Sequence, residues 1–250
     1  MKINIINNIK NFIFFSLCSR QSYHNVCTNQ PVKYCSFRKV RDYLINNKYN
    51  QDIYSTTKYD MSFIHKTITK NQELSKNQKL KRKRIKKRNQ NKYGLTAEHI
   101  YPQSLTKQYK SAKHDAHNIY LTLQTHNSYR NNYKYVDEID FTYNYRNSLY
   151  FSNNLKYDCT RNYKNTRLHY YIPIHKSRGK IARTLAYMKI NYPRLVLSDV
   201  IDKSTLIKWN FKYPPDRFEK YKNILCCKLQ GNTNIFIDDY NQLNNYIDVL

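Results

Sequence analysis

The sequence lacks the cysteine pattern of zinc-binding proteins and is poor in glycine. None of its six cysteines has the C-x-x-C spacing that is typical of zinc sites. Cys226 and Cys227 are neighbours that would not ordinarily bridge each other, and a disulfide such as Cys27 to Cys35 requires an oxidising compartment. Only three of the 250 residues are glycine, so each is expected to mark a backbone requirement.

The apolar run near the N-terminus, Phe12 to Cys18, is far shorter than the roughly 20 residues of a transmembrane helix. With Lys2 and Lys10 before it, the run resembles a signal peptide, but no A-x-A-like cleavage site follows. A disordered or packed segment is the alternative. We treat 1–35 as a separate N-terminal segment and leave the compartment open, with export, the nucleus and the virion all allowed.

Acidic residues are few: 17 Asp and Glu stand against 44 Lys and Arg, a formal charge of +27. A compact chain with this charge repels itself unless a polyanion compensates it. Nucleic acid is the commonest such partner, and an anionic membrane surface or an acidic protein is the alternative. The 40% hydrophobic and 15% aromatic content is typical of a folded protein with one substantial core. We expect a monomeric domain over 36–248 that binds nucleic acid, not membrane.

The basic charge is densest within an insertion at about 66–92. Seven cations occupy eight positions there: Lys81, Arg82, Lys83, Arg84, Lys86, Lys87 and Arg88. Like charges at this density extend the chain. The run is either a solvated loop, an arm that grips phosphates, or a nuclear-localisation-like signal.

The expected secondary structure is strand, strand, helix, followed by a helical C-terminal third. Strand-capable sequence surrounds 95–101 and 118–123, and a helix is predicted to start near Thr122 as N-cap and to run through Arg130. A further helix is predicted over 179–192, stopped by Pro193. Asp216 and Glu219 have capping-box spacing, and Gly231 follows at a C′-like position.

An acid and a base stand side by side at Glu98 and His99. A neutral histidine can take a proton from water, because its usual pKa is about 6.5. An oxygen ligand suits Mg²⁺ or Ca²⁺. Asn127 and Arg130 are three positions apart, so on a helix they share a face and offer an amide oxygen and a guanidinium. Taken singly, each of these residues could equally be an ordinary core or surface residue.

The order and spacing of these residues resemble the bacterial endonuclease I family. Residues 98–104 read E-H-I-Y-P-Q-S, residues 115–119 read D-A-H-N-I, and residues 126–132 read H-N-S-Y-R-N-N. Two further blocks follow in family order, S-R-G-K-I-A-R-T-L-A-Y-M at 177–188 and Q-G-N-T-N-I-F-I-D at 230–238. All three glycines fall inside or just before these blocks.

The resemblance implies an α+β fold, with a ββα-metal (His-Me) finger embedded in a mostly helical domain. It implies a sequence-nonspecific endonuclease that cleaves DNA, with RNA as a second candidate substrate, and leaves 5′-phosphate ends. His99 would be the general base, and Glu98 and Asn127 would hold one Mg²⁺, with Ca²⁺ or Mn²⁺ as alternatives. Arg130 and Arg183 would bind the phosphate or, as readily, form structural salt bridges. Asp115, His117 and Asn118 are expected to be structural.

One geometric demand follows from the sequence. Neighbours in a regular strand point to opposite faces, so Glu98 and His99 can serve one phosphate only if the backbone bends or ends there. We therefore predict an irregularity at 98–99.

The alternative to an active nuclease is an inactive basic packaging protein on the same scaffold. A decayed enzyme should have lost part of the set Glu98, His99 and Asn127, and all three are present.

Overall fold

The computed structural model describes residues 32–56, 95–137 and 162–250. The elements in chain order are α3 (Phe37–Asn46), β1 (Leu95–His99), β2 (Ile119–Leu123), α6 (Gln124–Arg130), β3 (Lys134–Tyr135), β4 (Tyr163–Asn165), β5 (Tyr170–Ile172), α8 (His175–Asn191), α9 (Lys203–Lys212), α10 (Arg217–Gln230) and α11 (Ile235–Asp238). This mixture of helices and two small sheets agrees with the predicted α+β class. None of the helices in these residues has the length and apolarity to cross a membrane.

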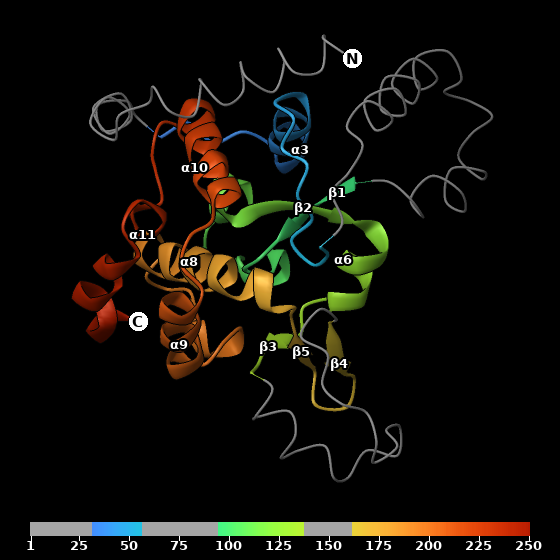
Figure 1. Ribbon diagram of the computed structural model, residues 1–250, viewed down its shortest axis with the longest axis vertical. Coiled ribbons are helices and arrows are strands. Elements are labelled where there is room, and N and C mark those ends of the chain that lie inside the picture. The colour runs from blue at the N-terminus through green and yellow to red at the C-terminus, as the bar shows by residue number, and fades with distance from the viewer. Residues whose placement is uncertain (1–31, 57–94, 138–161) are drawn as a thin grey trace, which may run out of the picture.

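An antiparallel pair, β1 and β2, forms the centre of the fold (Figure 1). One face of the pair packs on α3 and α10 through Ala97, Ile119 and Leu121. Tyr120 and Ile100 belong to the larger core around α8 and α9. The pair is therefore enclosed by helices from both ends of the described chain.

The helix after β2 begins later than the sequence suggested. Thr122 was expected to cap it, but Thr122 lies inside β2 and its hydroxyl donates to Asp52 Oδ1 at 2.8 Å. Leu123 precedes the first helical residue, Gln124, and makes no side-chain cap. The N-cap prediction is therefore wrong, because Asp52, 70 positions earlier in the chain, takes the hydroxyl that would have capped the helix.

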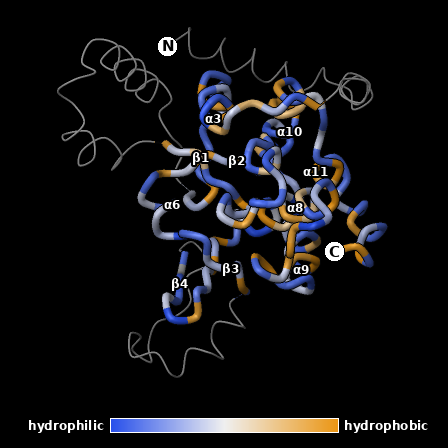
Figure 2. The backbone as a smooth tube through the Cα atoms, turned by 180° about the vertical axis from the view of Figure 1, so that it is seen from behind, coloured by the Kyte–Doolittle hydropathy of each residue, from blue (hydrophilic) through white to orange (hydrophobic). Residues whose placement is uncertain are grey.

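The C-terminal helices agree better with their local signals. The main chain N–H of Glu219 donates to Asp216 Oδ1 at 2.8 Å, and α10 ends at Gly231 with φ 100°. The predicted cap and stop are confirmed. The central helix α8 starts at His175, four residues before its predicted start at Gly179. Figure 2 shows apolar segments concentrated in α8 and α9, whereas α6 and β4 are largely hydrophilic.

The second sheet is small and lies next to α6. Its order is β3-β5-β4, with β3 parallel and β4 antiparallel to β5. Asn165 ends β4, and its Oδ1 atom accepts the main-chain N–H groups of Arg167 and Leu168, both at 3.0 Å. The turn between β4 and β5 is thus fixed by a side chain.

Candidate active site on the β1–β2 pair

Glu98 lies buried beneath β1, with 2% of its surface exposed. Its Oε1 atom accepts a hydrogen bond from the Tyr54 hydroxyl at 2.7 Å and lies 3.4 Å from Arg130 Nη1. Burial raises the pKa of Glu98 to about 7, and the charge of Arg130 opposes this rise. The carboxylate is therefore poorly solvated and only partly compensated by protein groups.

His99 lies on the other face of β1 and is 8% exposed. Its ring meets Phe37 of α3 edge-on at 5.3 Å, and its Nε2 atom lies 2.8 Å from the carbonyl oxygen of Lys113. A carbonyl only accepts, so Nε2 must carry the proton of the neutral ring. Burial lowers the pKa of His99 below its usual value, and the charges of His114, Arg130 and Lys113 act in the same direction. The ring is neutral at pH 7, with the lone pair on Nδ1.

Of the two irregularities predicted at 98–99, the bend is absent and the end of the strand is present. Antiparallel pairing is unbroken through Glu98 opposite Tyr120 and His99 opposite Ile119, and β1 ends immediately after His99. The two side chains consequently leave the strand on opposite faces. A shared phosphate could only be reached at the end of the strand, where the backbone turns at Ile100.

Arg130 connects the two neighbours across the strand end. The guanidinium is 1% exposed and donates to the carbonyl oxygens of His99 at 3.3 Å and Ile100 at 3.0 Å. Its carbon lies 4.5 Å from the centre of the Tyr135 ring. Arg130 therefore fixes the backbone of His99 as well as the Glu98 carboxylate.

Asn127 lies one helical turn before Arg130 on α6. Its Nδ2 atom donates to the carbonyl oxygen of Ala97 at 3.2 Å, which directs the side-chain amide toward β1 next to Glu98. Among the described residues, no donor binds the Oδ1 atom of Asn127. An anchored amide with its oxygen unused is the arrangement that a hard cation requires.

Glu98 and Asn127 together resemble a Mg²⁺ site that is completed by water and phosphate, not a site made of protein ligands alone. No group of three or more His, Cys, Asp or Glu side chains in the described residues could hold a metal. Mg²⁺ usually keeps several waters and is bound by one or two protein oxygens plus phosphate. The poorly compensated Glu98 carboxylate and the unused Asn127 oxygen match this pattern.

The sequence profile of the endonuclease I family matches residues 1–241, almost the whole chain. The chain belongs to the endonuclease I family. It is therefore an endonuclease, a hydrolase whose substrate is nucleic acid, in a family whose members depend on a metal ion. A search of curated proteins found no match.

The D-x-H-N block of the endonuclease is structural, as expected. Asp115 accepts hydrogen bonds from the hydroxyls of Tyr187 and Tyr192 at 3.1 and 2.8 Å. His117 is buried against Tyr187, with ring centres 4.6 Å apart. Asn118 accepts from the Tyr101 N–H at 2.7 Å and donates to its carbonyl at 3.1 Å. These bonds hold the segment that joins β1 to β2.

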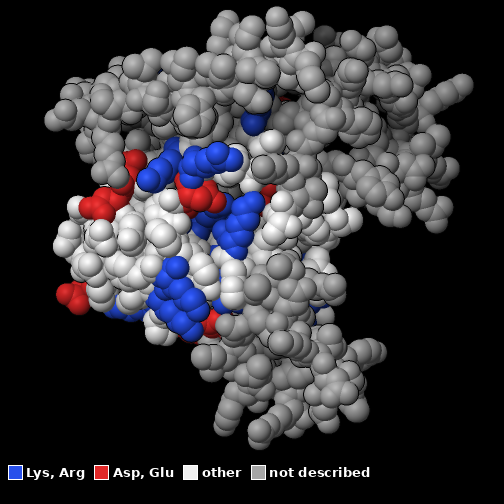
Figure 3. Space-filling view, viewed as in Figure 1, with Lys and Arg blue, Asp and Glu red and all other residues white. Residues whose placement is uncertain are grey.

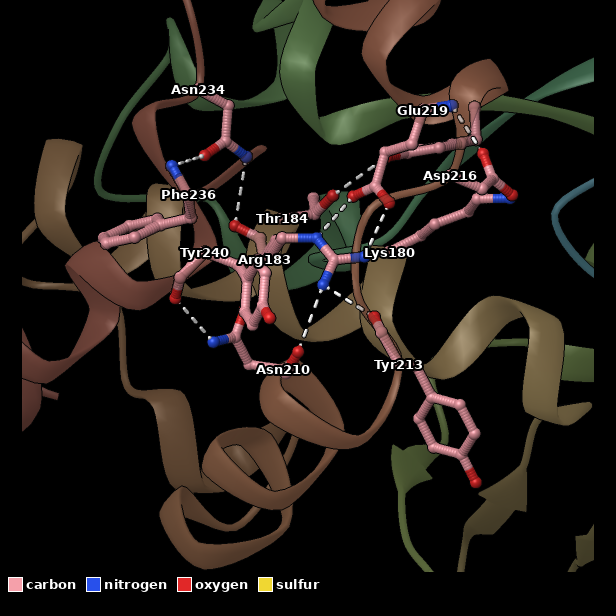
Figure 4. Close-up of polar contacts among 11 residues, drawn as sticks. Lys180, Arg183, Thr184, Asn210, Tyr213, Asp216, Glu219, Asn234, Phe236 and Tyr240 are labelled. Atoms are coloured by element: carbon pink, nitrogen blue, oxygen red, sulfur yellow. Dashed lines mark hydrogen bonds and ion pairs between the residues drawn. The ribbon is translucent and has the colours of Figure 1, made fainter. Parts of the chain in front are cut away.

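Arg183 has the structural role that the sequence left open. It is 1% exposed and binds Glu219 through two bonds of 2.8 and 2.6 Å. Its remaining nitrogen donates to the carbonyl oxygens of Asn210 at 3.3 Å and Tyr213 at 2.8 Å (Figure 4). Each of its three nitrogens donates inside the protein, so Arg183 joins α8 to α9 and α10.

Part of the basic charge of the endonuclease is neutralised by ion pairs. Figure 3 shows Lys and Arg side chains gathered near the middle of one face, with Asp and Glu beside them. Lys180 pairs with Asp216, and Lys134 with Asp202, each at 2.7 Å. The basic run from Lys81 to Arg88 lies outside the described residues.

Two residues that contribute to the site were not predicted from sequence. Tyr54 binds Glu98, and the carbonyl of Lys113 fixes the ring of His99. Tyr54 lies before the motif blocks at 98–238 on which the resemblance rests, and a main-chain carbonyl leaves no mark in the sequence. No local pattern could have identified either of them.

Proposed function

We propose that the protein is a Mg²⁺-dependent, sequence-nonspecific endonuclease that cleaves DNA, and RNA as well, with His99 as the general base. The observation that supports this most directly is the 2.8 Å bond between His99 Nε2 and the Lys113 carbonyl. It fixes the tautomer in which Nδ1 can accept a proton from water.

In this proposal Glu98 and Asn127 hold the cation. When bound, Mg²⁺ would stabilise the charge on the phosphoryl oxygens and on the departing 3′ oxygen. Ca²⁺ and Mn²⁺ have a similar preference for oxygen ligands and are the alternatives. Arg130 acts by holding Glu98 and the backbone of His99, not by direct contact with the phosphate, because it is buried.

His99 would take a proton from a water molecule whose oxygen attacks phosphorus. The bond from phosphorus to the 3′ oxygen then breaks, and the phosphate stays on the 5′ end of the downstream product. The general base and the cation both act on the phosphodiester. The enzyme therefore does not need to recognise any nucleobase, which is consistent with a sequence-nonspecific enzyme. The net charge of +27 supports binding through the phosphate backbone.

An inactive packaging protein is the second candidate. It would share the basic charge, but a packaging role needs neither the fixed tautomer of His99 nor the unused oxygen of Asn127. The experiment that separates the two measures plasmid and RNA cleavage with Mg²⁺ and with EDTA. Metal-dependent cleavage that is lost in His99→Ala, with nucleic-acid binding retained, is the expected result. No cleavage by the wild-type protein would leave the packaging role.

A further inference from the structure

A row of aromatic rings and a cation lies on the surface beside α6. Lys164 Nζ lies 4.3 Å from the centre of the Tyr129 ring and 5.9 Å from that of Tyr133. The Tyr133 ring stacks on His169 with 5.1 Å between ring centres and 12° between planes. We call Tyr129, Lys164, Tyr133 and His169 the aromatic row.

The aromatic row is accessible and firmly held. Tyr129 is 40% exposed, His169 is exposed, and Tyr133 and Lys164 are half-buried. His169 has a positive φ of 56°, and its carbonyl accepts the main-chain N–H of Lys134 at 2.8 Å. A histidine in this conformation costs free energy, so the surrounding bonds must hold it there. Rings that are fixed before a ligand arrives lose little entropy on binding.

The charge around the aromatic row favours an anionic ligand. The two segments that form it, 124–135 and 162–172, contain no Asp or Glu. Of their four Lys and Arg residues, Arg130 is paired with Glu98 and Lys134 with Asp202. The other two are Lys164, within the row, and Arg167, exposed in the turn between β4 and β5. An apolar protein partner would not require this bias, whereas a polyanion with flat rings matches it.

The aromatic row adjoins the proposed active site. The Tyr129 ring meets Tyr171 at 6.3 Å, Tyr171 meets Tyr54 at 5.2 Å, and the Tyr54 hydroxyl binds Glu98. Tyr129 lies on α6 two residues after Asn127, so the two side chains leave different faces of the same helix. Figure 1 shows α6 between β1 and the sheet that carries β4 and β5. Because Tyr171 and Tyr54 are buried, a strand whose phosphate reaches the edge of the site would cross the surface of α6 to lay neighbouring nucleotides on these rings.

We infer that the aromatic row is a stacking surface for unpaired nucleobases, so that the enzyme engages single-stranded or locally opened nucleic acid next to the cleaved bond. Every base has a flat face, so this contact adds affinity without sequence preference. Lys164 and Arg167 would meet the phosphates between the stacked bases. This inference rests on the proposed nuclease function, which supplies the reason for a strand to lie here.

The test measures binding without cleavage. In EDTA and in the His99→Ala background, fluorescence anisotropy compares a labelled oligothymidylate, an abasic strand of equal length and a duplex. Stacking predicts that the oligothymidylate binds at least about fivefold more tightly than the abasic strand. Tyr129→Leu should remove most of this difference, and Tyr129→Phe should keep it because the ring remains.

Two controls keep the result clear. Tyr34→Leu changes a tyrosine that is equally exposed, at 44%, and contacts Tyr192 instead, so the preference should stay. If Tyr129→Leu lowers the unfolding midpoint, the exposed His169→Ala takes its place. Equal binding of the base-bearing and abasic strands, tighter binding of the duplex, or a preference unchanged in both row variants would overturn the inference. Plasmid and RNA cleavage by the wild-type enzyme with Mg²⁺ reports separately on the nuclease function.

Discussion

Arg130 Nη1 lies 3.4 Å from Glu98 Oε1 and 3.3 Å from the carbonyl oxygen of His99. A single buried guanidinium therefore touches both neighbours whose side chains leave β1 on opposite faces. This contact explains how two such residues are held in a constant relation at the end of a regular strand.

Removing Arg130 should cost both stability and activity. Arg130→Met leaves the Glu98 carboxylate buried without its cation, a change that typically costs about 3–5 kcal/mol. The double variant Arg130→Met/Glu98→Gln should recover much of the unfolding free energy in urea, but no cleavage. If the double variant were as unstable as the single one, the loss would come from packing and not from the ion pair.

The acid limb of activity should lie below the usual histidine range. The pKa of His99 is lowered by burial, so the ring is more than half neutral at pH 6.5. At saturating Mg²⁺ we expect the acid limb of the kcat/KM profile to have its midpoint below pH 6.5. An acid limb centred above 6.5 at saturating Mg²⁺ would contradict the assignment of His99 as the base.

Limiting metal should add a second pH dependence. The pKa of Glu98 is raised to about 7 in the protein alone, so below that pH protons compete with the cation for the carboxylate. The apparent Mn²⁺ affinity, measured by titration calorimetry, should weaken as pH falls from 8 to 6, roughly tenfold per unit below 7. Glu98→Gln removes the titrating group and should bind weakly at every pH. Unchanged affinity in this variant would exclude Glu98 as a ligand.

His117 should make the fold sensitive to acid. Burial lowers its pKa to about 4, below the 6.5 of an unfolded histidine. Because the folded pKa is depressed, the unfolded state binds more protons between pH 6.5 and 4. The free energy of unfolding therefore decreases as the pH is lowered from 6.5 to 4. The loss amounts to about 3 kcal/mol. His117→Gln, measured by urea unfolding, should flatten this slope, and an unaltered slope would assign the sensitivity to other groups.

Gly179 should not tolerate a side chain. A Cβ there would collide with the carbonyl oxygen of Tyr213 and approach the Tyr213 Cβ to 2.9 Å. The backbone between α9 and α10 cannot move without disturbing Arg183, which binds the same carbonyl. Gly179→Ala should lower the unfolding free energy by about 1–3 kcal/mol. Lys220→Ala, at an exposed position of α10, should change it little.

The parts of the fold that depend on local chemistry were predictable. The cap at Asp216 and the stop at Gly231 follow from bonds within a few residues and were found where expected. The start of α6 was misplaced because Thr122 bonds to Asp52, far away in the chain. Short-range patterns carry no information on such contacts.

The candidate site was recognised by ordered motifs, but its geometry was not. Sequence indicated Glu98, His99 and Asn127, and it predicted that the strand bends or ends at 98–99, where it ends without a bend. A regular strand is compatible with the candidate site because Arg130 binds the backbone at the end of the strand and the Tyr54 hydroxyl binds Glu98. Both contacts arise from tertiary packing, which no spacing rule describes.

The helix α10 holds the candidate site in place from far along the chain. Lys222 Nζ donates to the carbonyl oxygens of Ala116 and His117 at 3.1 and 3.2 Å, and Gln230 accepts the N–H of Ala116 at 2.7 Å. These bonds hold the segment whose Lys113 carbonyl orients the base. A chain still being translated has Glu98, His99 and Asn127 long before it has Gln230. The bonds that hold this segment can therefore form only after the chain has been synthesised through Gln230.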